Sequence, residues 1–373
     1  MSIRIEEVKT KKQKRLFIDM PYVVGVGDNP NFVPPLFGDE MKILNGKTDY
    51  AKDSDSVFYI AYKGNKPVGR ISGIVQSAYN KAHNEKTARF TRFDCIDDLE
   101  VAKALFEAAE SWARAQGMNI IVGPLDYSDM EREGLLIEGF DQMSTFEEQY
   151  HPEYYKKLVE ACGYEKDVDY LEFRLYPPKE RSDRIQRIAN VALRMNKLHE
   201  APLLPIKQYA KKYYKGFFGL MNVCYAHLYG TVEFDEESAL ATLNQFSSIL
   251  DSRFVPIILD QNDNVVAAAI AFPGLNEAIK PSKGRLTLPA LLRIRKAVKN
   301  PKTADLGLIA VHPDYQKKGV NAVFLAKMMG FFDIGVKWLE TNLNLETNED
   351  VMSQWKAFDA VNHKRRRVYK KVL

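Results

Sequence analysis

Residues 303–332 constrain the fold of this chain more than any other stretch, because a strand, a tight turn and a helix follow one another there. Residues 306–311 form a short apolar run between polar residues, which is typical of a buried strand. Pro313 then ends any strand pairing, since proline has no amide hydrogen to donate. Residues 322–332 are apolar on nearly every helical face, so the sequence predicts a buried helix after the turn.

The turn before this helix carries the sequence QKKG at 316–319. The start of a helix leaves about four N–H groups unpaired and carries roughly half a positive charge, so it attracts phosphate groups. Gly319 suits a position where the backbone approaches an anion closely or takes a positive φ. The pattern indicates a phosphate-binding turn, although an ordinary strand-to-helix connection with a glycine explains the same residues equally well.

The sequence VHPDYQKKGVNA at 311–322 resembles the acyl-CoA signature of the GNAT acetyltransferase superfamily. Gln316 and Gly319 match that signature, whereas Asn321 stands where Gly or Ala is usual. Asparagine tolerates left-handed backbone geometry better than most residues, so the match is kept. The resemblance implies that the turn binds the CoA pyrophosphate and that the preceding strand binds the pantetheine arm. The residues implied in cofactor binding are Ile309, Ala310, Val311, Gln316, Lys317, Lys318, Gly319, Val320, Asn321 and Asn348.

Length and charge set further limits. A chain of 373 residues is expected to form two domains of ordinary size. Its 53 Lys and Arg against 49 Asp and Glu give a net charge of +4, which does not indicate a nucleic-acid partner. The three cysteines show no metal-ligand spacing, so we expect no metal and a reduced, cytoplasmic protein. The first residues, SIRIEEVKTKKQKR, are basic but contain no apolar run, so we expect no signal peptide. The longest apolar run, residues 265–272, is too short to span a bilayer.

The first half predicts a mixed domain of strands and helices. Strands are expected at 1–8, 56–61, 67–75, 87–93, 119–122 and 167–175, and helices at 9–20, 99–116 and 151–161, with a loop at 23–46. This order is the GNAT order. Where the phosphate turn should stand, however, the chain reads CIDDLE at 95–100, and its carboxylates would repel a pyrophosphate. We therefore predict that the first domain does not bind CoA and shapes the acceptor pocket.

A loop at 123–141 follows a predicted strand and is rich in glycine and carboxylates, as are loops at the functional edge of a sheet. Together with residues 29–36, 68–71 and 154–155, it resembles a bacterial family of tandem GNAT proteins. That family usually has Asn near Asp126 and Asn or Asp near Met130. The predicted acceptor-pocket residues are Asp126, Tyr127 and Ser128, and a structural loop held by Asp126 and Ser128 explains them equally well.

The second half repeats the plan after a break at Pro177 and Pro178. Residues 207–228 are aromatic and basic; they predict a helix packed on a core rather than a surface that stacks bases. Other helices are expected at 182–196, 235–250, 288–298 and 348–360, strands at 253–259, 265–272, 336–345 and 364–372, and a loop at 273–287. The only repeat is this structural one.

Catalysis needs a proton source for the leaving thiolate. In GNAT proteins this is often the tyrosine of Asn-x-x-Ala-x-x-x-Tyr, but here residues 348–355 end in Trp355, whose indole cannot serve. The candidate catalytic residues are instead Tyr369, Glu340 and Glu346, while the resemblance implies that Asn348 holds the pantetheine amide. A strand aromatic, solvated carboxylates and a helix N-cap explain these four residues equally well.

The sequence thus predicts an α/β (α+β) protein of two GNAT-like domains, 1–176 and 177–373, each a mixed, mostly antiparallel sheet flanked by helices. We expect an N-acyltransferase that uses acetyl-CoA or a longer acyl-CoA and a small-molecule or lipid amine acceptor. The basic C-terminus, residues 363–371, favours a solvated edge strand guarded by lysines, and the alternatives are contact with the CoA phosphates or peripheral contact with an anionic membrane surface. The alternatives are a catalytically weak acyl-CoA-binding protein and a Fem-type aminoacyltransferase, which the QKKG turn disfavours. The acceptor, the acyl chain length and the oligomeric state are open.

Overall fold

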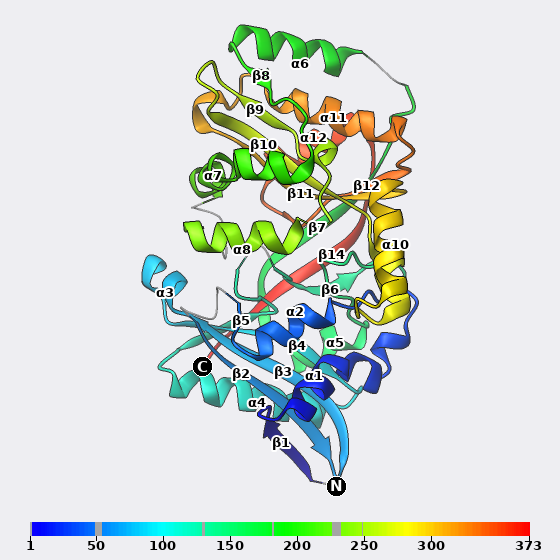
Figure 1. Ribbon diagram of the computed structural model, residues 1–373. Helices are drawn as coiled ribbons and strands as arrows, with labels where there is room; N and C mark the ends of the chain where they lie inside the picture. Colours follow the sequence, from blue (N-terminus) through cyan, green and yellow to red (C-terminus); the bar gives the residue numbers. More distant parts are fainter. Residues whose placement is uncertain (1, 49–53, 129–130, 181–182, 226–232, 248) are drawn as a thin grey trace. The chain divides into compact units, whose positions relative to one another are not determined.

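The computed structural model describes residues 2–48, 54–128, 131–180, 183–225, 233–247 and 249–373 (Figure 1). The chain forms two compact units, the first of residues 1–171, 276–290 and 363–373, the second of residues 172–275 and 291–362. The division predicted at residue 177 remains a prediction; unlike these units, it cuts the chain only once. Parts of predicted segments lie outside the described residues, namely residues 1, 129–130 (which include Met130), 182, 226–228 and 248.

The first unit contains most of the N-terminal elements. Its strands are β1 (Ile3–Glu7), β2 (Ser54–Lys63), β3 (Lys66–Gln76), β4 (Thr87–Cys95), β5 (Ile120–Gly123), β6 (Leu135–Glu138), the start of β7 (Glu165–Tyr176) and most of β14 (Asp359–Val372). Its helices are α1 (Lys11–Val23), α2 (Phe37–Leu44), α3 (Ser77–His83), α4 (Leu99–Ala115), α5 (Tyr154–Ala161), α9 (Asn276–Ile279) and the start of α10 (Leu288–Lys299).

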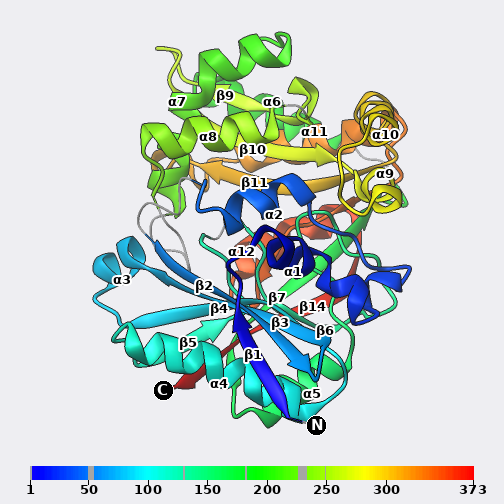
Figure 2. The same cartoon turned by 60° about the horizontal axis from the view of Figure 1, so that its bottom comes forward.

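The sheet of the first unit has the order β1-β2-β3-β4-β5-β14-β7, with β6 paired to β14. The pairs β1–β2, β2–β3, β3–β4 and β5–β14 are antiparallel, and β4–β5 is parallel. Helices cover both faces (Figure 2). Because side chains alternate along β2, Ala61 joins the core under α4 and α5, and Ile60 joins the core under α1 and α2.

The second unit contains the remaining elements. Its strands are the end of β7, β8 (His199–Glu200), β9 (Ile257–Leu259), β10 (Val265–Pro273), β11 (Thr303–Val311), β12 (Trp338–Glu340), β13 (Asn344–Leu345) and the start of β14. Its helices are α6 (Arg184–Met195), α7 (Ile206–Tyr225), α8 (Glu236–Phe246), the end of α10, α11 (Asn321–Asp333) and α12 (Glu349–Gln354).

The sheet of the second unit has the order β7-β12-β11-β10-β9-β8. The pair β11–β12 is parallel, and the pairs β7–β12, β10–β11, β9–β10 and β8–β9 are antiparallel. α11 packs against α6 and contributes Val323 and Phe324 to a core with Ile258 and Ala267. Both units therefore confirm the predicted fold class of mixed, mostly antiparallel sheets flanked by helices.

Several predicted boundaries are wrong. The helix predicted at 348–360 ends at Gln354, and β14 already begins at Asp359. The strand predicted at 364–372 is therefore longer at its start, where residues 359–362 are all exposed and show no alternation that would mark a strand. The strand predicted at 336–345 is two short strands, β12 and β13. The loops predicted at 23–46, 123–141 and 273–287 contain α2, β6 and α9.

Candidate functional site

β11 and β12 start as a parallel pair and then separate. Thr303, Ala304 and Asp305 pair with Trp338, Leu339 and Glu340, and the register between these two strands ends there. β11 continues for six more residues, to Val311. The last part of β11 is therefore paired with β10 on one side and is not paired with β12 on the other.

A β-bulge marks the point of separation. From Ala269 to Ala271 β10 advances two residues, while the paired positions on β11, Ile309 and Leu306, are three residues apart. Gly307 lies inside this bulge, and a Cβ atom there would come within 2.9 Å of the Phe272 ring. A bulge increases the local twist and bends its strand, which explains why β11 turns away from β12.

Beyond the bulge, the main-chain groups of Ile309 and Val311 point away from β10. The His312 N–H donates to Val266 O at 2.9 Å, and hydrogen-bonded pairs alternate along an antiparallel ladder. Ala310 therefore faces β10, whereas its two neighbours face the side from which β12 has separated. That edge of β11 offers amide and carbonyl groups in the pattern of an unpaired strand.

Side chains occupy this edge. Tyr225, the last residue of α7, donates its hydroxyl to Ile309 O at 3.0 Å and accepts the Ile309 N–H at 3.3 Å. Cys224 Sγ and Gln316 Nε2 both donate to Val311 O, at 3.4 and 3.0 Å. Burial raises the pKa of the Cys224 thiol, so it stays protonated as a donor.

The turn after β11 leads into α11 with two residues in the left-handed region, Lys317 at φ 58° and Gly319 at φ 79°. The side chains of Lys317 and Lys318 are exposed. The N-cap residue of α11, Val320, makes no side-chain cap hydrogen bond. The start of this helix thus combines an uncapped N-terminus with two exposed cations, an arrangement that favours anions.

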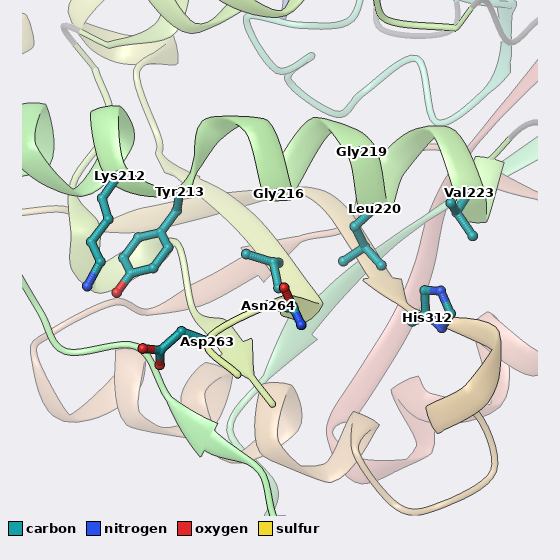
Figure 3. Close-up of a pocket in the computed structure, with 10 residues that line it drawn as sticks. Lys212, Tyr213, Gly216, Gly219, Leu220, Val223, Asp263, Asn264 and His312 are labelled. Atoms are coloured by element: carbon teal, nitrogen blue, oxygen red, sulfur yellow. The ribbon is translucent and has the colours of Figure 1, made fainter. Parts of the chain in front are cut away.

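A cavity of about 380 Å³ lies beside α7 in the same unit (Figure 3). One wall is α7, including Gly216, Gly219 and Val223; the opposite wall is the β9–β10 turn together with His312. A Cβ atom at Gly219 would meet nothing within 4 Å. The last turns of α7 therefore have open space on one side.

Two curated proteins are similar to this chain along nearly its whole length. No family model matches the chain. The chain is 26% identical over 379 residues to Protein YghO of Escherichia coli K12, a match that covers 97% of this chain and 94% of that protein. It is 28% identical over 386 residues to a protein named bacterial ceramide synthase from Caulobacter vibrioides, with coverages of 98% and 96%.

Solved structures agree on the fold. The chain matches a tandem GNAT protein from the clavulanic acid biosynthesis pathway with a TM-score of 0.58 at 11% identity, over 100% of this chain and 98% of that one. The chain has the tandem GNAT fold. A GCN5-related N-acetyltransferase from Sphaerobacter thermophilus matches with a TM-score of 0.54 at 8% identity, over 99% of this chain and 95% of that one.

The structure brings most of the predicted CoA residues of this GNAT fold together. Ile309, Ala310 and Val311 form the end of β11, and residues 316–321 form the turn and the start of α11. Asn321 is the first residue of α11, and the positive φ values fall on Lys317 and Gly319, so its tolerance for left-handed geometry is not used. Asn348 caps α12 by accepting the Val351 N–H at 3.3 Å.

The candidate catalytic residues are spread over both units. Glu340 is buried and accepts from Arg174 at 2.8 Å, and Glu346 is half-buried after β13. Tyr369 lies in the core of the first unit, where its hydroxyl donates to Glu160 at 3.1 Å and burial raises its pKa. The catalytic roles of these three residues remain predictions. Trp355 is also buried, and its indole donates to Asn344 at 3.2 Å.

The predicted acceptor residues are buried in the first unit. Asp126 accepts from Arg92 at 2.9 Å, and Arg92 also donates to Glu40. Burial raises the pKa of Glu40, but the charge and hydrogen bonds of Arg92 outweigh it and lower the value to about 2. Tyr127 and Ser128 are 2% exposed each. These contacts hold the loop, and an acceptor role for the three residues remains a prediction.

Sequence reasoning missed Tyr225 and Cys224 as neighbours of β11. Tyr225 belongs to the aromatic run predicted to pack on a core, and four earlier residues of that run are buried, namely Tyr209, Tyr213, Phe217 and Phe218. The available signal in the sequence was the position of Tyr225 near the end of the helix. A tyrosine at a helix end is often only half-buried and can donate its hydroxyl to a neighbouring element. Within the described ranges, no three His, Cys, Asp or Glu side chains are grouped to hold a metal ion, and no helix is long and apolar enough to cross a bilayer.

Proposed function

We propose that the protein is an acyl-CoA-dependent N-acyltransferase whose donor binds in the second unit, along the end of β11 and at the start of α11. The separation of β11 from β12 carries this proposal. It leaves the outward-facing amide and carbonyl groups of Ile309 and Val311 beside a basic, uncapped helix start. The pantetheine arm of CoA contains amides that can hydrogen-bond to such a strand edge. The pyrophosphate of CoA is an anion that the unpaired N–H groups and the positive charge of such a helix start can bind.

The reaction transfers the acyl group from sulfur to nitrogen. The neutral amine attacks the thioester carbonyl, a C–N bond forms and the C–S bond breaks. One proton of the amine is transferred to the sulfur of the leaving thiolate, so the products are the amide and free CoA. The fold supports acyl transfer to an amine in general, and the acid and base are still to be assigned. Glu340 and Glu346 are the predicted candidates in the same unit as β11.

The acyl chain and the acceptor are proposed from the relatives. A ceramide is the amide of a fatty acid with a long-chain amino alcohol, and one relative at 28% identity is named a ceramide synthase. A long-chain acyl donor with a lipid amine is therefore the first combination to test, followed by acetyl-CoA with small amines. We also propose that the first unit lacks a CoA site and that the protein works in the cytoplasm.

The test is calorimetric titration of acetyl-CoA and of longer acyl-CoAs into the protein and into Gly319→Glu. The variant places a carboxylate where the pyrophosphate would lie and strains a backbone at φ 79°, so binding should weaken at least 100-fold. Gly335→Glu is the matched control, because it changes another left-handed glycine, at φ 97°, after the opposite end of α11. Absence of binding by any acyl-CoA would overturn the proposal.

A second candidate is an acyl-CoA-binding protein with little or no activity. The position of the usual GNAT acid is Trp355, which is buried and donates to Asn344. Mass spectrometry of amine acceptors incubated with the preferred acyl-CoA separates the two candidates. Tight binding without any N-acylated product across lipid and small amines would favour the binding protein.

A further inference from the structure

Tyr225 makes an unusual pair of contacts with β11. Its hydroxyl lies 3.0 Å from Ile309 O and 3.3 Å from Ile309 N, so one group acts as donor and acceptor toward the same residue. A neighbouring strand, or an amide-bearing ligand, would contact these two groups in the same way. The preceding residue, Cys224, contacts the next outward-facing carbonyl, that of Val311. The last turn of α7 thus covers the edge where the proposed function places pantetheine.

The last turn is held less firmly than the rest of α7. The first four turns pack through aromatic side chains that are almost fully buried, including Tyr209, Phe217 and Phe218. Met221 is still buried, and Asn222 exchanges two hydrogen bonds with Phe234, at 2.7 and 2.8 Å. Beyond them Val223 is 49% exposed, and Cys224 and Tyr225 are half-buried. The helix end after Asn222 therefore has less buried apolar surface, so it can separate from β11 without unfolding the rest of α7.

The last three turns of α7 are also not tightly packed on one side. The cavity of about 380 Å³ runs along Gly216, Gly219, Leu220 and Val223 (Figure 3). Two glycines in a helix interior lower its intrinsic stability relative to alanine. Displacement of Cys224 and Tyr225 from β11 would leave the outward-facing groups of Ile309 and Val311 available to another partner.

We propose that the structure is a closed state in which Tyr225 occupies the place of a pantetheine amide, so that acyl-CoA binds only after the last turn of α7 has left β11. This inference rests on the proposed function and adds a competing intramolecular contact to it. Breaking that contact costs free energy and so lowers the apparent affinity for acyl-CoA, because only the open population is competent to bind.

The test is the affinity of Tyr225→Phe for acyl-CoA. The variant keeps the ring and removes both hydrogen bonds, so acyl-CoA should bind about tenfold more tightly. Tyr214→Phe is the matched control: it removes a hydroxyl from the same helix that contacts Glu236 instead of β11, and its affinity should be unchanged. Thermal melting checks that both variants fold. Unchanged or weaker binding by Tyr225→Phe would overturn the inference, weaker binding meaning that the phenol contacts bound acyl-CoA.

Hydrogen exchange of the unmodified protein gives a second test. Acyl-CoA should slow exchange in residues 308–311 and speed it in residues 221–225. Slower exchange in both segments would contradict the closed state. The two proposals fail differently: if the protein binds acyl-CoA, Gly319→Glu does not, and Tyr225→Phe resembles the unmodified protein, only this inference fails. If neither the protein nor Tyr225→Phe binds any acyl-CoA, the proposed function fails with it.

Discussion

The two units contain the same strand-helix-strand junction with opposite chemistry. In each, a bulged strand is followed by a helix and a parallel partner: β4-α4-β5 in the first unit and β11-α11-β12 in the second. α4 is capped by Asp98, whose carboxylate accepts the N–H groups of Glu100 and Val101. α11 has no side-chain cap and follows two exposed lysines. The first helix start is therefore filled by the chain's own anion, and the second is left for another.

The strand edges differ in the same sense. In the first unit, the Cys95 N–H donates to the hydroxyl of Tyr155, and Tyr154 donates to Cys95 O at 2.8 Å. Tyr155 is fully buried in the main core of that unit. In the second unit the corresponding contacts come from Tyr225 at the half-buried end of a helix. One junction is sealed by its core, whereas the other is closed by a contact that can be released.

The largest expected effect is a loss of stability when the buried ion pairs of β4, in the first junction, are broken. Arg92, on β4, is 5% exposed and pairs with both Glu40 and Asp126. Arg92→Met leaves two buried carboxylates without their cation, so the free energy of unfolding should fall by about 3–5 kcal/mol. Arg253→Met, which breaks a more exposed pair with Asp251, should cost roughly 0–1 kcal/mol. Urea denaturation measures both, and equal losses would contradict a structural role for the first junction.

The Arg92–Glu40 pair predicts that the stability of the protein depends on pH. The pKa of Glu40 is about 2 in the folded protein against an ordinary value of 4.5. The unfolded chain therefore binds more protons between these values, and the stabilisation is present above pH 4.5 and lost as the pH falls toward 2. Urea denaturation across this range should show the loss in the unmodified protein.

A middle-sized effect concerns the open junction. Replacing Lys317 and Lys318 together with glutamine should weaken acyl-CoA binding about tenfold at low salt, and less at high salt, because exposed charges are screened. The control replaces Arg295 and Lys299, two exposed cations on α10, with glutamine. Calorimetry at two salt concentrations measures both. The same loss in the control would mean that only the net charge matters.

The smallest effect concerns the cap of α4. Asp98→Ala should lower the free energy of unfolding by about 1 kcal/mol, because it removes the acceptor of two helix N–H groups. Asp98→Asn keeps an acceptor and should cost less. Acyl-CoA binding should not change in either variant, as titration will show. New binding stoichiometry in Asp98→Ala would mean that the first unit holds a latent CoA site.

Local chemistry was predictable from the sequence, and long-range contacts were not. The strand, the QKKG turn and the following helix depend on neighbouring residues, and each is where the sequence placed it. Arg92 lies on β4 and pairs with Asp126 in the loop after β5, so no local pattern signals that Asp126 is buried. Tyr225 lies far from Ile309 in the chain, and only folding brings its hydroxyl to that strand edge. Tyr369 alternates like a strand residue, but its burial in the first unit depends on pairing with Gly123.

The central claim is that only the second junction binds acyl-CoA, and hydrogen exchange with mass spectrometry tests it most directly. The protein is compared with and without saturating acyl-CoA. The account predicts slower exchange in residues 308–323, at the end of β11 and the start of α11, and no change in residues 90–102 around Asp98. Slower exchange at 90–102, with 308–323 unchanged, would contradict it.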